Sequence, residues 1–310
     1  MHEVPPPDVD GRQLEQARED IRRRAFGRWH SMQYGGMCLA DLAEMRDELM
    51  DHAAARIATD PSLDEPLRVV LRTAAECSLG LLGVGCFPDG DQEIDLPLVG
   101  EQLSSEYIAF SEVVDAAPTA AEWTEAFELC LISGLLWEWR RVIGGLLRED
   151  YAPAIRDGVP YSTFEPVSTA AETARMDALA EYLTLSSGHL PRDWPKLTLS
   201  KPGTDALAAA AARLDAAGPL SPDQRLLRCL LDDDRQAFEP ALAARLAEHR
   251  EAVGADPAPR TLLPTGPLAL AALAVQVHGW QLDVRSPYLP QALLGSTDTA
   301  ARAAAAGPTT

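Results

Sequence analysis

One group of acidic side chains and a histidine has residue types that could bind a metal ion. Glu44, Glu48 and His52 follow one another at four-residue steps, which would place them on one face of a helix. Zinc and di-iron sites need His and Glu at fixed helical spacings, and the chain contains no His-Glu-x-x-His sequence. We therefore interpret this face as a solvated acidic surface in which His52 pairs with a carboxylate.

Two aspartate-rich segments resemble parts of cation sites. Residues 89–95 imitate the first half of a calcium-binding loop, but Ile94 stands where the sharp turn requires glycine, and Gly100 where the bidentate glutamate belongs. The consecutive aspartates 232–234 are of the kind that holds magnesium and diphosphate, but the next helical turn supplies no further carboxylate. We interpret the first segment as an acidic loop and the second as a helix start that complements the helix dipole. No metal site is predicted.

Patterns for nucleophilic catalysis and for nucleotide binding also fail. No serine lies in a Gly-x-Ser-x-Gly elbow. Gly80, Gly83 and Gly85 follow a helical pattern instead of a strand, which favours close helix packing over a dinucleotide site. His278 fits the C-terminal end of a helix, where it would favour the local dipole. The chain is therefore not predicted to be an enzyme and has no predicted catalytic residue or cofactor; an enzyme with a site assembled from distant residues is the least favoured interpretation.

The charge pattern has one unusual segment. No lysine or arginine occurs between Arg72 and Arg140, whereas acidic residues continue throughout. Like charge without compensation opposes compaction, and complementary charge speeds the encounter of two proteins. Two interpretations stay open: the drift of an acidic composition, or a surface adapted to a basic partner. In the second case the predicted contact residues are Asp89, Asp91, Glu93, Asp95, Glu101, Glu106 and Glu112.

Overall composition narrows the classes of partner. The 310 residues carry 27 lysines and arginines against 47 aspartates and glutamates, a formal net charge of −20. Nucleic acids and anionic membranes attract surfaces rich in lysine and arginine, so neither is a predicted partner. The five cysteines form no Cys-x-x-Cys pair, which is typical of reduced thiols. The first residues lack the basic and apolar regions of a signal peptide, so we expect a cytoplasmic protein without a membrane span.

Helix signals dominate the rest of the sequence. Capping boxes, in which Ser or Thr is followed three residues later by Glu or Gln, occur at Ser62/Glu65, Thr119/Glu122, Thr169/Glu172 and Ser221/Gln224. The periodicity predicts helices over 11–30, 38–59, 63–86, 101–115, 119–148, 169–186, 204–217, 222–231, 235–252 and 266–278.

Strand signals are few. The segment 94–99 contains Pro97, which demotes it as a strand, and 280–284 alternates only briefly. The expected fold class is all-α, either a multi-helix bundle or stacked antiparallel helix pairs, with no substantial β-sheet.

The C-terminal third contains several motifs in a fixed order. Arg260-Thr-Leu-Leu-Pro-Thr-Gly-Pro-Leu opens a helix of small residues, Gly279-Trp follows it, and Ser286-Pro-Tyr-Leu-Pro-Gln-Ala-Leu-Leu closes the segment. This order and spacing resembles the closing segment of the immunity protein 49 (Imm49) family of bacterial polymorphic toxin systems, encoded beside toxins in actinobacteria. We interpret its shared residues as structural: Pro264, Gly266, Pro267, Gly279, Trp280, Pro287, Tyr288, Leu289 and Pro290.

The resemblance implies an all-α domain over 62–294, preceded by an N-terminal helical extension, 1–61, and followed by a tail, 295–310, that we expect to be disordered. It also implies an immunity protein that binds and neutralises a cognate protein toxin stoichiometrically; a basic, nuclease-type toxin would suit the acidic segment. A helical scaffold or adaptor unrelated to toxins is the alternative. The resemblance carries over no toxin-contact residues, and the oligomeric state is left open.

Overall fold

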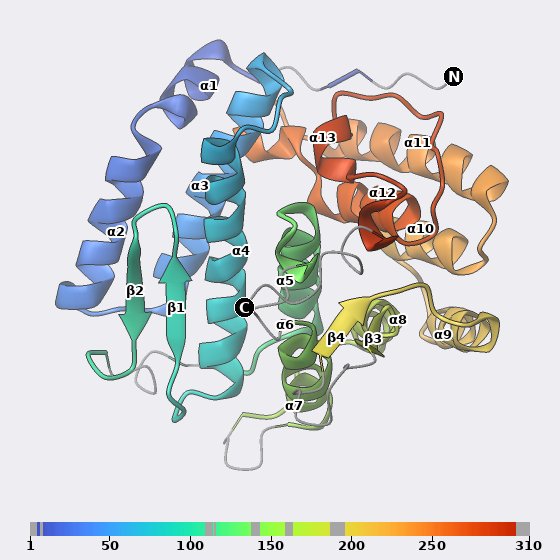
Figure 1. Cartoon of the computed structure of the whole chain (residues 1–310), viewed down its shortest axis with the longest axis horizontal. Coiled ribbons are helices and arrows are strands. Elements are labelled where there is room, and N and C mark those ends of the chain that lie inside the picture. The colour runs from blue at the N-terminus through green and yellow to red at the C-terminus, as the bar shows by residue number, and fades with distance from the viewer. Residues whose placement is uncertain are drawn as a thin grey trace.

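Helices form nearly all the regular structure of this chain. The computed structural model describes residues 5–6, 9–108, 114, 116–137, 143–158, 164–186 and 196–301. Within these residues the strands form two separate antiparallel pairs of two strands each (Figure 1). The predicted all-α class is confirmed.

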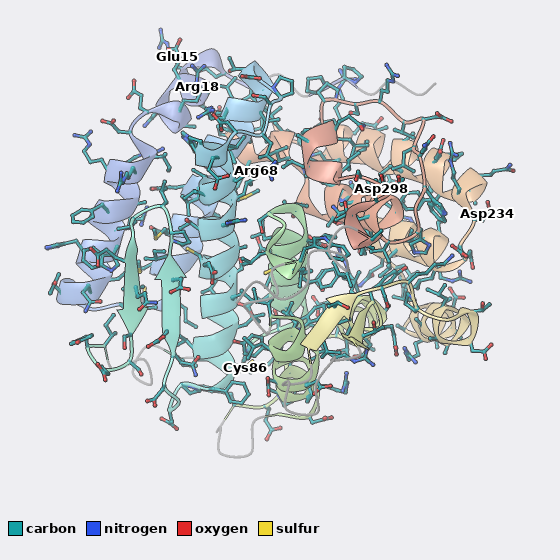
Figure 2. The ribbon with its side chains drawn as sticks, in the orientation of Figure 1. Glu15, Arg18, Arg68, Cys86, Asp234 and Asp298 are labelled. Carbon is teal, nitrogen blue, oxygen red and sulfur yellow. The ribbon has the colours of Figure 1, made fainter. Side chains whose placement is uncertain are left out.

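The N-terminal half is built on one apolar helix, α4, against which α3 packs, while α1 and α2 pack against α3. All residues of α4 from Thr73 to Cys86 are buried, so it forms the centre of this half of the molecule; Figure 2 labels Arg68 and Cys86 near its two ends. It is the one helix among the described residues that is long and apolar enough to cross a membrane, but 78% of its apolar window is buried inside the fold. The bounds are α1 (Gly11–Arg18), α2 (Ile21–Gly35), α3 (Leu39–Thr59) and α4 (Glu65–Cys86).

The predicted single helix over 11–30 is wrong, because the chain turns at Asp20. Asp20 has a left-handed backbone with φ of 40°, and α1 and α2 then both pack against α3. The guanidinium of Arg24 donates to the Ala17 carbonyl at 2.9 Å and so satisfies an acceptor that the end of α1 leaves open. His52 also contacts this carbonyl, with Nδ1 at 3.0 Å. Its predicted pairing with a carboxylate on a solvated face is therefore wrong: His52 is buried.

The described residues in 120–137 and 143–157 form several short helical segments instead of the single helix predicted over 119–148. Helix α5 stops before Gly134, whose φ of 82° ends the helical path. At Gly144 a Cβ would collide with the Leu197 carbonyl, so glycine permits the close approach of this segment to strand β4. The bounds are α5 (Ala120–Ile132), the 3₁₀-helix η2 (Leu135–Trp137), α6 (Ile143–Gly145), the π-helix η3 (Leu146–Tyr151) and α7 (Ala152–Asp157).

The C-terminal half packs around α12, which is buried from Gly266 to Gln276 and contacts α5, α10, α11 and α13. The helices predicted over 204–217, 222–231, 235–252 and 266–278 are confirmed to within two residues. The helix predicted over 169–186 is too long, because its last residues form β3. The bounds are α8 (Ala170–Ala180), β3 (Leu183–Ser186), β4 (Lys196–Leu199), α9 (Thr204–Ala216), α10 (Pro222–Leu231), α11 (Arg235–Ala252), the 3₁₀-helix η4 (Pro259–Leu262), α12 (Thr265–Gln276) and α13 (Gln291–Leu294).

Local capping chemistry starts most of the helices that the sequence predicts. Thr119, Thr169 and Ser221 each form a reciprocal capping box with the residue three positions later. The Ser62 box is wrong: Asp64 is the N-cap of α4, and its carboxylate accepts from the Leu67 N–H at 3.0 Å. Aspartate competes well for this position, because it adds a charge that complements the helix dipole.

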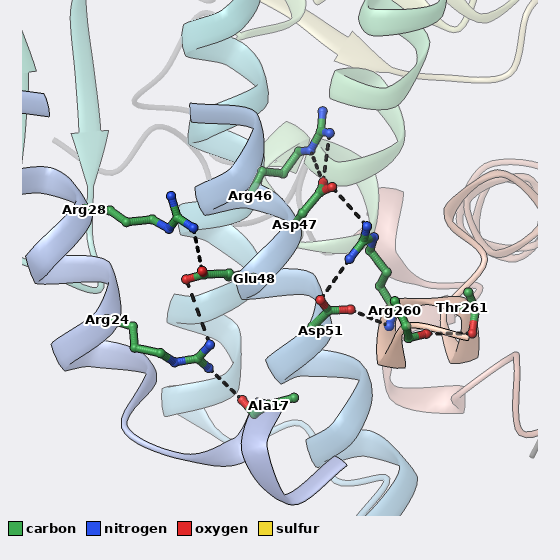
Figure 3. A network of polar contacts seen from close by, with 10 residues as sticks. Ala17, Arg24, Arg28, Arg46, Asp47, Glu48, Asp51, Arg260 and Thr261 are labelled. Atoms are coloured by element: carbon green, nitrogen blue, oxygen red, sulfur yellow. Dashed lines mark hydrogen bonds and ion pairs between the residues drawn. The ribbon is translucent and has the colours of Figure 1, made fainter. Parts of the chain in front are cut away.

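A chain of ion pairs joins α3 to the segment before α12. Arg260 of η4 pairs with Asp47 at 3.3 Å and Asp51 at 2.9 Å, both on α3 (Figure 3). On the other side of α3, Glu48 pairs with Arg28 of α2 at 2.6 Å. Arg260 and Asp51 are about 200 positions apart in the sequence, yet they form an ion pair at α3. Helix α3 therefore connects the N-terminal helices to the C-terminal half.

Candidate functional site

Six of the seven predicted contact residues lie on one β-hairpin. Strands β1 (Glu93–Leu96) and β2 (Glu101–Ser104) pair in register, with Asp95 opposite Gln102. The strand dismissed at 94–99 therefore exists, and Pro97 lies in the turn that ends it. The helix predicted over 101–115 is wrong where it can be compared, because its first residues are β2. We call residues 89–106 the acidic hairpin.

The inner face of the acidic hairpin is fixed against α4 and α2. Ile94 and Leu103, which are cross-strand partners, are both buried. Gly80 of α4 leaves room for Ile94: a Cβ there would lie 2.7 Å from the Ile94 Cδ1 atom. Trp29 of α2 donates from Nε1 to the Gln102 carbonyl at 3.0 Å. These contacts make the hairpin a supported surface instead of a free loop.

The outer side of the hairpin carries carboxylates without basic partners. Within the described part of the chain, the exposed Asp89, Asp91, Glu93, Glu101 and Glu106 form no ion pair with lysine or arginine. Asp95 is half-buried, and its carboxylate accepts from the Gln102 side chain at 2.5 Å. The seventh predicted residue, Glu112, lies outside the described residues. Six of the seven thus share one supported hairpin.

Other carboxylates from the same lysine-free and arginine-free segment do have partners. Glu125 of α5 pairs with Arg46 of α3 at 2.6 Å, and Glu128 of α5 pairs with Arg175 of α8 at 2.5 Å. The basic residues missing along the sequence are therefore supplied in space by other helices. Sequence reasoning missed these pairs, since no local signal links residues 47 or 79 positions apart.

Glu128 of α5 has a strongly perturbed carboxyl group. Burial raises its pKa to about 7, against the opposing charge of Arg175. Arg175 also lies 3.9 Å from Asp223, which pairs with Arg245 at 2.5 Å. Each charged group in this cluster has a protein partner. The cluster is therefore a structural ion-pair network that connects α5, α8, α10 and α11.

His278 belongs to a second interior group. Its Nε2 lies 2.8 Å from the Tyr182 hydroxyl, and its Nδ1 lies 2.8 Å from an Asp233 oxygen. Burial lowers the pKa of His278 below its usual value, against the opposing effect of the Asp233 carboxylate. His278 directly follows Val277, the C-cap residue of α12, so its predicted position at the end of a helix is confirmed. Its imidazole joins α12 to the turn before α11 and to the end of α8.

The aspartates 232–234 have separate protein partners. Asp232 pairs with Arg228, Asp233 pairs with Lys201 at 2.5 Å, and Asp234 caps α11 by accepting from the backbone of Gln236 at 2.8 Å. The predicted helix start is confirmed for Asp234. Among the residues that the structure describes, no group of three or more His, Cys, Asp or Glu side chains is arranged to hold a metal ion.

The closing motif, residues 260–294, contains α12 and the segments on either side of it. Pro264 is the N-cap residue of α12, and Gly266 lies where a Cβ would approach the Asp223 carboxylate to 2.5 Å. Gly279 has φ of 73°, which suits glycine. Trp280 contacts the His278 ring, with centroids 4.8 Å apart. Pro267 is also buried in α12.

The end of that motif lines an apolar groove. Tyr288 and Leu289 are buried, and the Tyr288 ring meets His249 edge-on at 5.4 Å. Pro287, Leu289 and Pro290 face a groove of about 860 Å³ whose other wall is made by α1 and α3. The groove is lined by aliphatic side chains and prolines with few polar groups, so it offers no chemistry for catalysis.

Comparison with known proteins agrees with the closing motif. A sequence model of the family described as immunity protein 49 matches residues 60–293. No curated protein and no solved structure matches the chain. The match covers most of the chain and includes α4, the acidic hairpin, the Glu128–Arg175 pair and nearly all of the closing motif. This protein belongs to the immunity protein 49 family.

Proposed function

We propose that this protein binds a cognate toxin stoichiometrically, and that the acidic hairpin contacts a basic surface of that toxin. Membership of an immunity family implies a toxin partner in general. The observation that supports the finer proposal is the contrast within one acidic segment: carboxylates on α5 are paired with arginines, whereas Asp89, Asp91, Glu93, Glu101 and Glu106 are exposed and unpaired in the described part of the chain.

This protein would inhibit the toxin by covering its catalytic surface and not by catalysing a reaction. A stable protein–protein interface buries about 1,200–2,000 Å² in total, which is enough to cover a catalytic cleft or the path to it. A nuclease-type toxin has a basic cleft because its substrate is a polyanion, and a row of fixed carboxylates presents similar charge to that cleft. Long-range attraction would speed association, so the inhibitor could act soon after both proteins meet in the cytoplasm.

The direct test is co-expression with the toxin encoded beside this gene. We expect cells that carry both genes to survive and cells that carry the toxin alone to die. We also expect the two purified proteins to elute together as a complex of defined stoichiometry. Undiminished killing, with this protein present in soluble form, would refute the proposal.

The contact surface is tested by charge reversal. The triple variant Glu93→Lys, Glu101→Lys, Glu106→Lys should lower the association rate constant by at least about tenfold at low salt, with a smaller effect as salt screens the attraction. The matched control is Glu15→Lys, Asp157→Lys, Glu251→Lys, which changes the same charge at exposed sites on α1, α7 and α11. Equal effects of the two triple variants would reject the hairpin as the contact surface.

A further inference from the structure

Helix α2 carries a row of exposed aromatic rings beside the acidic hairpin. Phe26, His30 and Tyr34 follow one another at four-residue steps, so they lie along one side of the helix. Phe26 is 46% exposed and Tyr34 is 71% exposed. Large apolar side chains exposed to this degree are few in the described part of the chain, and the other aromatic one, Tyr107 at 72%, follows directly after the acidic hairpin.

The row is ordered by its own contacts. The His30 and Tyr34 ring centroids lie 4.8 Å apart, and the buried Trp29 contacts Phe26 at 5.2 Å and Tyr34 at 6.2 Å. Rings held in this way lose little conformational entropy when a partner covers them. Trp29 also bonds to the Gln102 carbonyl of β2, so the aromatic row and the acidic hairpin are joined by one side chain. In Figure 1, β2 lies next to α2.

We propose that the aromatic row of α2 and the acidic hairpin form one docking surface for a protein face rich in arginine. This inference rests on the proposed function and names the chemistry that the surface recognises. Guanidinium groups pair with carboxylates and also stack on aromatic rings, and lysine does the second less well. Tyrosine is one of the side chains that most often contribute large shares of binding energy at interfaces, and phenylalanine is enriched in interface cores.

The charges around the row set the direction in which the surface extends. Arg28 is neutralised by Glu44 at 2.8 Å and Glu48 at 2.6 Å. Arg22 is exposed one turn before Phe26 and has no ion-pair partner within the described residues, so it would repel a basic partner. The docking surface therefore runs from Phe26 towards Tyr34 and the hairpin, away from the start of α2.

The proposal assigns part of the recognition to residues outside the family match. Helix α2 precedes residue 60, where the match begins, whereas the hairpin lies within it. The hairpin would then supply attraction to basic surfaces in general, and the aromatic row would supply short-range contacts that hold one partner.

The test compares the full chain with Phe26→Ala, Tyr34→Ala for binding to the toxin encoded beside this gene, measured by surface plasmon resonance. Two central aromatic contacts should be worth at least about a 30-fold loss of affinity, mainly through faster dissociation. Val167→Ala is the control, because Val167 is also exposed, at 62%, but lies between α7 and α8. Arg22→Glu should raise the association rate. An affinity within twofold of the wild type for Phe26→Ala, Tyr34→Ala would overturn the proposal.

A second probe does not depend on the toxin. Deca-arginine and deca-lysine peptides are titrated into the same proteins by calorimetry. We expect the wild type to bind deca-arginine more tightly than deca-lysine. Phe26→Ala, Tyr34→Ala should lose this preference, and Val167→Ala should keep it. Suppose that the wild type fails to protect cells but binds deca-arginine more tightly than deca-lysine, and that Phe26→Ala, Tyr34→Ala loses this preference. The proposed function then fails and the docking surface stands. If the wild type protects cells and shows no such preference, the docking surface fails alone. A wild-type dimer that Tyr34→Ala converts to a monomer would mean that a second copy covers the row, which also overturns the proposal.

Discussion

Helix α5 and the acidic hairpin use the same residue types in opposite ways, although both lie in the segment without lysine or arginine. Both α5 carboxylates meet arginines: Glu128 is buried and pairs with Arg175, and the partly exposed Glu125 pairs with Arg46, whose side chain is only 13% exposed. The exposed hairpin carboxylates face solvent and form no ion pair with lysine or arginine among the described residues: Asp89, Asp91, Glu93, Glu101 and Glu106. The first set determines how helices pack, and the second leaves its charge available to a partner.

This difference shows that a run of like charge in a sequence is not one functional unit. A buried carboxylate must be paired or neutralised, because removing charge from water costs several kcal/mol. An exposed carboxylate is screened by water and can remain unpaired at little cost to stability. Mutations in the two regions should therefore separate stability from binding.

The largest expected effect on stability comes from removing one side of a buried pair. Arg175→Met leaves Glu128 buried without its cation and should lower the free energy of unfolding by about 3–5 kcal/mol at pH 8. Urea denaturation measures this value. The double variant Arg175→Met, Glu128→Met removes both charges and should recover much of the loss. A loss below about 1 kcal/mol in the single variant would contradict the comparison, because it would mean that the pair is not effectively buried.

The second effect is a dependence on pH. Burial raises the pKa of Glu128 to about 7 from an unfolded value near 4.5, so the folded protein holds this proton over a range in which the unfolded chain has released it. The free energy of unfolding should fall as pH rises from about 4.5 to 7, by up to roughly 3 kcal/mol, and then level off. Glu128→Gln should remove this slope relative to the wild type. Parallel curves for the two proteins from pH 4.5 to 8 would argue against the assignment.

A smaller loss should follow from displacing the acidic hairpin from α4. In Gly80→Ala the new Cβ would lie 2.7 Å from Ile94, so the hairpin must shift, at a cost of about 1–3 kcal/mol. Ile94→Val in the same chain should restore part of this loss. Toxin association should also weaken, since the carboxylates move with the hairpin. Full stability in Gly80→Ala would show that the hairpin is not held at this contact.

The smallest expected change in stability belongs to the hairpin carboxylates. Glu93→Lys, Glu101→Lys, Glu106→Lys should alter the free energy of unfolding by no more than about 0.5 kcal/mol per site, while toxin association slows. Urea denaturation and binding kinetics on the same preparation give both values. A large loss of stability together with unchanged association would reverse the roles that we assign to the two regions.

Local chemistry in the sequence is enough to predict much of the helical framework. Thr119, Thr169 and Ser221 start helices as predicted, because a capping box involves only residues three positions apart. The predictions fail where packing overrides local preference. The segment 101–104 follows a helical pattern but pairs as a strand with 93–96 over the glycine face of α4. Gly134 ends α5 earlier than the apolar periodicity indicates.

The sequence by itself determined the all-α class, the acidic character and the resemblance to an immunity family, because periodicity, composition and motif order need no knowledge of distant contacts. Only the tertiary structure decided which carboxylates are neutralised and which stay exposed, and that the aromatic row of α2 lies beside the acidic hairpin. The physical reason is range: capping and periodicity act over a few residues, whereas Glu128 meets Arg175 and Trp29 meets Gln102 only after helices far apart in the chain have packed together.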